Sequence, residues 1–143
     1  MNKSISASDL GIHLKDEDES ALFKWFIASF LMGKRIQAEI AAQAYRVIVE
    51  KHGRDTARKL GGCSHRQLVS MLGEAHYVRY DETTATRLLN LCKKLSDEYA
   101  GKIGHIHAAS ENRHAFEQRL REFDGVGPKT VEIFMRDAAA VLY

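Results

Sequence analysis

The sequence has only one proline in 143 residues, and no segment shows a clean alternation of apolar and polar residues. Proline breaks the interior of a helix, so its scarcity favours long uninterrupted helices. Strict alternation marks a half-buried β-strand, and its absence argues against a sheet. We therefore predict an all-α fold, a compact bundle of roughly six or seven helices.

Cysteines and long apolar runs are also scarce. Two cysteines, Cys63 and Cys92, are too few and too far apart for a disulfide framework or a metal cluster. Cys92 falls on the apolar face of an expected helix, so we interpret it as a small core residue and not as a nucleophile. No run approaches the ~18 apolar residues of a membrane span, and the acidic N-terminus lacks the apolar core of a secretory signal. We expect a cytoplasmic protein with no membrane partner.

Charge of one sign is not in excess, because the net charge is only +2. The distribution is uneven, however. Residues 34–66 hold eight basic and three acidic residues, whereas residues 1–20 hold five acidic residues and two lysines. The basic segment could contact phosphate groups, and the alternative is a solvated helix surface.

The apolar spacing predicts one domain over residues 18–143, preceded by a loose arm over residues 1–17. Trp25 lies on a helix with apolar residues on most of its faces, so we interpret it as a core residue. His105 and His107 fall in an expected loop over 102–110, where surface histidines are favoured over a metal pair. The other expected elements are a helix over 19–32 capped by Asp18, a helix over 36–52 ended by Gly53, a short turn over 55–60, a helix opened by the Ser64-x-x-Gln67 capping box and closed by Gly73, a helix over 82–99 capped by Asp81 and ended by Gly101, and a helix over 111–122 capped by Ser110.

The segment Asp124-Gly125-Val126-Gly127-Pro128-Lys129 separates two apolar-periodic segments. Glycines permit a tight turn with a positive φ, and Val126 can place its side chain inward. Pro128 suits the first position of a helix. The sequence therefore predicts a helix N-terminus with exposed amides beside two glycines, which is an anion site suited to phosphate.

Lys129 lies in the first turn of that helix. A positive helix end disfavours an ammonium group there, and a neutral amine is what a Schiff-base nucleophile needs. The alternative is a lysine that contacts phosphate or is merely exposed.

The stretch FDGVGPKTVEIF resembles the helix–hairpin–helix of the HhH-GPD superfamily of DNA glycosylases, typified by endonuclease III. The order of helices from residue 19 to residue 142 is also similar to the helical domain of that family. The resemblance implies that the amides of Gly125, Val126 and Gly127, with Lys129 and Thr130, grip the DNA backbone. It places Lys129 at the position of the lysine that attacks the sugar C1′ in bifunctional members. Lys34 and Arg35 fall near the segment that enters the DNA gap in endonuclease III.

The sequence also departs from the family. The family's catalytic aspartate lies further beyond the hairpin than the 14 residues that follow Lys129. Asp137 is too far along the helix to replace it, and Glu132 is expected to pair locally with Lys129. The iron–sulfur cysteines are absent, so we expect no cofactor and no metal.

Three hypotheses follow. The first is a DNA-binding protein similar to base-excision-repair glycosylases and abasic-site lyases, with double-stranded, damaged or abasic DNA as its partner and Schiff-base chemistry at Lys129. The second is a non-catalytic DNA-structure binder. The third is a helical interaction domain without DNA binding, whose apolar tail, Ala138–Tyr143, suggests a homodimer or a partner chain.

Overall fold

The computed structural model describes residues 4–15 and 18–143. Within these ranges the chain forms helices and no strand, which confirms the all-α fold, with eight α-helices where six or seven were expected. The α-helices are α1 (Glu19–Met32), α2 (Ala38–Tyr45), α3 (Ala57–Gly61), α4 (His65–Glu74), α5 (Asp81–Tyr99), α6 (Ile103–Ala108), α7 (Arg113–Leu120) and α8 (Pro128–Leu142); a 3₁₀ turn, η1 (Ser8–Leu10), precedes them, and a π-helical turn, η2 (Arg46–Lys51), continues α2.

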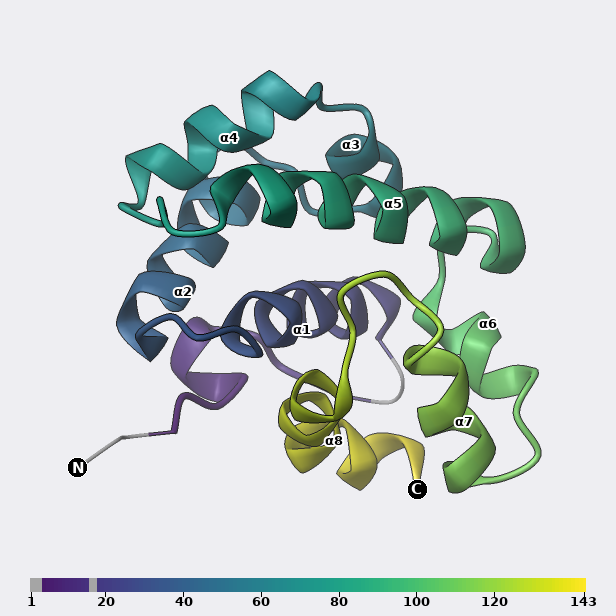
Figure 1. The fold of residues 1–143 in the computed structure, drawn as a ribbon. Helices are drawn as coiled ribbons and strands as arrows, with labels where there is room; N and C mark the ends of the chain where they lie inside the picture. The colour runs from purple at the N-terminus through teal and green to yellow at the C-terminus, as the bar shows by residue number, and fades with distance from the viewer. Residues whose placement is uncertain (1–3, 16–17) are drawn as a thin grey trace.

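Helix α1 lies in the middle of the molecule (Figure 1). Its N-cap is Asp18, whose carboxylate accepts the amide hydrogens of Ser20 and Ala21, as the sequence predicted. Ten of its fourteen residues are buried, because α2, α6 and α8 pack against it. Trp25 is a core residue, with its indole Nε1 donating to the carbonyl oxygen of Phe134 on α8 over 3.0 Å. This bond ties α1 to the helix that follows the hairpin.

A second layer, made of α3, α4 and α5, lies on the opposite side of α1 from α8 (Figure 1). Helix α5 is the spine of this layer and packs against both α3 and α4. The capping box that opens α4 is present as expected, with Ser64 and Gln67 exchanging hydrogen bonds. Cys92 lies on α5 as a buried core residue, and burial raises the pKa of its thiol to about 12, so it stays protonated.

The expected loop over 102–110 is wrong, because α6 occupies most of it. Helix α6 has no side-chain cap of its own. The carboxylate of Glu19 instead accepts the amide hydrogens of Ile103 and Gly104 over 2.5 and 2.8 Å. His105 is exposed on this helix, and the ring of His107 packs edge-on against Phe116 and Tyr143.

Three expected helix boundaries also differ. Gly73 lies inside α4, and the helix ends before His76, which takes a positive φ of 63°. Asn112, rather than Ser110, caps α7 by accepting the amide hydrogen of Ala115 over 2.9 Å. Asp81 is not the cap of α5 but its first residue; Tyr80 is the N-cap, with a positive φ of 65° and no side-chain cap. The end of α5 at Ala100 and Gly101, both with positive φ, agrees with the expectation.

The N-terminal segment was expected to be a loose arm. Over residues 4–15 it packs onto the domain, with Ala7, Leu10 and Ile12 all buried; residues 1–3 and 16–17 lie outside the described residues. Asp137 on α8 holds it, since its carboxylate accepts the Ala7 amide hydrogen over 2.7 Å. Residues 4–15 therefore pack against the domain and contribute side chains to its core.

Candidate nucleic-acid interface

The hairpin between α7 and α8 arches across α1 toward α5 (Figure 1). Gly125 has a positive φ of 80°, a conformation that favours glycine. Val126 is buried, as expected, and its amide donates to the carbonyl oxygen of Phe123 over 3.1 Å. Gly127 is the N-cap of α8 and Pro128 its first residue. The turn and the proline-led helix start thus agree with the sequence reasoning.

The hairpin is fixed in place by close contacts on both sides. A Cβ built on Gly125 would lie 2.7 Å from Cε2 of Phe30 on α1 and 3.0 Å from Cδ of Arg87 on α5. The carboxylate of Asp124 accepts a hydrogen bond from the Asn90 side chain over 2.8 Å and pairs with Arg87 over 3.7 Å. Both helices therefore position the turn.

The start of α8 is anchored in the same way. Thr130 is fully buried, and a Cβ on Gly33, at the end of α1, would overlap its Oγ1 atom. The Thr130 hydroxyl therefore faces the protein, and only its backbone could serve the DNA contact that the resemblance assigns to it. Gly127 differs from both anchored glycines, because a Cβ there meets nothing within 4 Å and its φ of −102° is ordinary.

Four amides of this segment have no acceptor among the described residues: those of Gly125, Gly127, Lys129 and Thr130. The first amides of any helix lack an intrahelical partner, and here no side chain replaces it. The Val126 amide was expected in the clamp but cannot bind an anion, because it donates to the carbonyl oxygen of Phe123. A group of amides without acceptors at a helix N-terminus is suited to an anion.

Cationic side chains surround these amides. The hollow at the hairpin, about 580 Å³, is lined by Lys34, Arg87, Arg121 and Lys129, and Asp124 is its single carboxylate. Lys34 and Lys129 were expected here. Arg87 and Arg121 were missed, because their positions on α5 and after α7 carry no signal until those elements meet at the hairpin.

Lys34 occupies an unusual place in this hollow. Its Nζ donates a hydrogen bond to the carbonyl oxygen of Gly125 and lies 4.4 Å from the centre of the Phe30 ring. Burial, and next the positive charge of Arg87, lower the pKa of this amine, while Asp124 acts in the opposite direction. Lys34 therefore holds the turn directly, in addition to lining the hollow.

A second and larger hollow, about 730 Å³, adjoins the first. Lys34 and Lys129 line both, and the larger hollow is also lined by Arg35, Arg136 and one carboxylate, that of Glu39. Lys129 is exposed. Asp137 is held by the Ala7 amide. Glu132 makes no ion pair with Lys129, so that expected pair is wrong; Glu132 lines a different groove.

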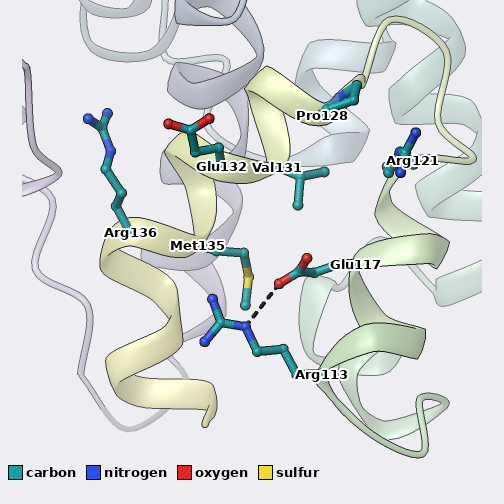
Figure 2. A pocket seen from close by; sticks show the side chains of 8 residues that line it. All are labelled: Arg113, Glu117, Arg121, Pro128, Val131, Glu132, Met135 and Arg136. Atoms are coloured by element: carbon teal, nitrogen blue, oxygen red, sulfur yellow. Dashed lines mark hydrogen bonds and ion pairs between the residues drawn. The ribbon is translucent and has the colours of Figure 1, made fainter.

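That groove runs between α7 and α8 and holds about 400 Å³. In Figure 2, Val131 and Met135 point from α8 toward α7, and Arg113 pairs with Glu117 over 2.9 Å. Arg136 points away from α7 (Figure 2), which agrees with its place on the rim of the larger hollow. The two faces of α8 thus border separate depressions.

Comparison of the chain with protein-family models, curated proteins and solved structures gives no match. Membership of the HhH-GPD superfamily therefore stays a prediction from the hairpin and the order of helices.

The basic segment over 34–66 is not one surface at the hairpin. Only Lys34 and Arg35 line the two hollows, whereas Lys51 pairs with Glu74 over 2.6 Å and Lys59 with Asp55 over 3.3 Å. The cations at the hairpin come instead from α5, the end of α7, and α8. Six of the eight basic residues of this segment therefore line neither hollow.

Three further features bear on the expected partners. Within residues 4–15 and 18–143, no group of three histidine, cysteine or acidic side chains could hold a metal ion, and no helix of the described chain is both long and apolar enough to cross a membrane. In the apolar tail, Ala138 and Leu142 are buried, whereas Tyr143 is half exposed although its ring packs against His107 and Phe116. The core therefore accounts for part of the apolar tail.

Proposed function

We propose that this protein binds double-stranded DNA by gripping its phosphate backbone at the hairpin, and that its target is damaged or abasic DNA. The observation that carries the proposal is the group of amides without acceptors, from Gly125 to Thr130, inside a hollow rimmed by four cationic side chains. Amides at a helix N-terminus bind phosphate oxygens, and arginine and lysine add the charge that dominates affinity for DNA.

The rigid support of the hairpin favours this function over an incidental anion site. The turn is held by Phe30 on α1, Asn90 and Arg87 on α5, and Lys34 just after α1. A clamp that is already in its binding conformation loses less entropy when it takes a ligand. Phosphate contacts position a protein on DNA without reading its sequence, so we expect binding to duplexes of unrelated sequence.

The abasic part of the proposal rests on the two lysines beside the clamp. Lys129 and Lys34 line both hollows, and a primary amine next to a held phosphate can reach the aldehyde of an abasic deoxyribose. The motif alone favours Lys129 as that amine. Asp137 does not join them, because it is engaged by the N-terminal segment. Schiff-base formation requires the amine and no carboxylate, so it is the step proposed here.

Gly127→Val tests the clamp with little risk to the fold. The side chain enters open space and the backbone already has an ordinary φ, yet three new carbons stand among the amides. The matched control is Gly73→Val on α4, where a Cβ also meets nothing within 4 Å. Binding would be measured by fluorescence anisotropy on a labelled duplex carrying one abasic site.

We expect Gly127→Val to weaken binding by at least about tenfold, as for the loss of one or two charge-assisted hydrogen bonds, and Gly73→Val to leave it unchanged. The affinity of the unsubstituted protein should fall steeply with salt. Equal affinities for the two variants would overturn the clamp. No binding at all would favour the interaction-domain hypothesis.

A further inference from the structure

Four lysines on the surface pair with carboxylates: Lys51, Lys59, Lys93 and Lys94. Lys34 is half-buried, yet no carboxylate pairs with it in the described part of the chain. Asp124, which lines the same hollow, is engaged by Arg87 and Asn90. Burying an amine without a counter-ion is costly, and such placements occur at functional sites.

The position of this amine relative to the clamp is specific. Its Nζ donates to the carbonyl oxygen of Gly125, in the same turn whose amides lack acceptors. The sugar of a nucleotide lies directly beside its phosphate, so a phosphate on those amides brings a deoxyribose toward Lys34. Lys34 also lines the larger hollow, which gives a displaced sugar room. Lys129, in contrast, is exposed on the first turn of α8.

We infer that Lys34, and not the motif lysine Lys129, is the amine that forms a Schiff base with the ring-opened sugar of abasic DNA. This inference rests on the proposed binding of duplex DNA at the hairpin. The neutral amine of Lys34 adds to the C1′ aldehyde, and a C–N bond forms. The carbonyl oxygen leaves as water after taking up protons from the amine and from solvent, which leaves a protonated imine. No electrons are gained or lost.

The surroundings of Lys34 favour the neutral form that this step needs. Phe30 supplies an apolar face, and Arg87 repels an ammonium group. Arg121 and Lys129 add positive charge to the same hollow, where Asp124 is the opposing charge. The larger hollow adds Arg35 and Arg136, opposed by Glu39. Burial and Arg87 together lower the pKa of the Lys34 amine. An ordinary lysine, with a pKa of about 10.4, is almost fully charged at neutral pH.

Arginine substitution separates this chemistry from mere support of the hairpin. Lys34→Arg keeps a cation that can donate to the Gly125 carbonyl, but a guanidinium does not form an imine. Lys129→Arg is the matched variant at the motif position. The probe is a duplex with one abasic site, treated with borohydride, which reduces the imine to a stable secondary amine. The trapped peptide is identified by mass spectrometry, and duplex binding is measured in parallel.

We expect the unsubstituted protein to be trapped at Lys34. Lys34→Arg should abolish the adduct even at duplex concentrations that saturate its binding, because a guanidinium does not form an imine. Lys129→Arg should still be trapped. As pH rises, the rate of trapping should level off below pH ~10, the range of an ordinary lysine.

Trapping at Lys129 that survives Lys34→Arg would overturn the inference and leave the proposed DNA binding intact. Duplex binding by the unsubstituted protein without any adduct would also overturn the inference, since Lys34 would then only hold the turn. Failure of the unsubstituted protein to bind the duplex would instead reject the proposed function on which the inference depends.

Discussion

Gly125→Ala should destabilise the protein, and two features of the structure give the expected loss in the free energy of unfolding. The residue has a φ of 80°, and a left-handed backbone costs a non-glycine residue about 1–2 kcal/mol. The added Cβ would lie 2.7 Å from Cε2 of Phe30, which is fully buried and cannot move freely. Overpacking of this kind costs about 1–3 kcal/mol.

The free energy of unfolding should therefore fall by about 2–5 kcal/mol, or about 6–20 °C in Tm for a chain of this size. Urea denaturation followed by circular dichroism measures it. Gly127→Ala is the control: its φ is ordinary and its Cβ is unobstructed, so stability should change by no more than ~1 kcal/mol, because the gain from a stiffer unfolded chain opposes the poorer N-cap. A loss below about 0.5 kcal/mol for Gly125→Ala would refute the packing argument, because surface substitutions cost that little.

Three further changes test the fold and its pH response. Trp25→Phe removes the hydrogen bond to the Phe134 carbonyl and should lower stability by about 1–3 kcal/mol in urea denaturation, with a loss under 0.5 kcal/mol as the contrary result. Asp137→Ala should speed hydrogen exchange of the Ala7 amide without affecting that of Leu60, because only Ala7 depends on this carboxylate; equal protection of Ala7 in both proteins would contradict the contact. Burial raises the pKa of Glu19 above its unfolded value of 4.5, so the folded state binds more protons and stability falls as pH rises from 4.5 through the folded pKa. Glu19→Gln should remove that part of the decline in Tm, and an unchanged Tm–pH curve would count against it.

Much of the fold followed from local signals in the sequence. The bounds of α1 and its Asp18 cap, the capping box of α4 and the glycine end of α5 are set by residues within one turn of the boundary. The buried state of Trp25 and Cys92 followed from helical spacing. Such features are readable because cause and effect lie close together in the chain.

The missed features have distant causes. Helix α6 was read as a loop because its first amides are accepted by Glu19, 84 and 85 residues away. The packing of residues 4–15 depends on Asp137, 130 residues from Ala7. No local sequence pattern predicts either contact.

The candidate site divides in the same way. The glycines, Pro128 and the buried Val126 side chain were readable from the turn itself. The partners of Lys34 and the contributions of Arg87 and Arg121 required the fold, because three helices meet there. The occupied amide of Val126 likewise depends on how the turn closes on Phe123.

Amide chemical shifts measured during titration with a short duplex test the central claim most directly. In a ¹⁵N-labelled protein, the largest shifts should occur at Gly125, Gly127, Lys129 and Thr130, the amides without acceptors. The amides of η2 and α3, which carry four of the eight basic residues of segment 34–66, should move little. Large shifts confined to η2 and α3, or no shifts with duplex in excess, would contradict binding of DNA at the hairpin.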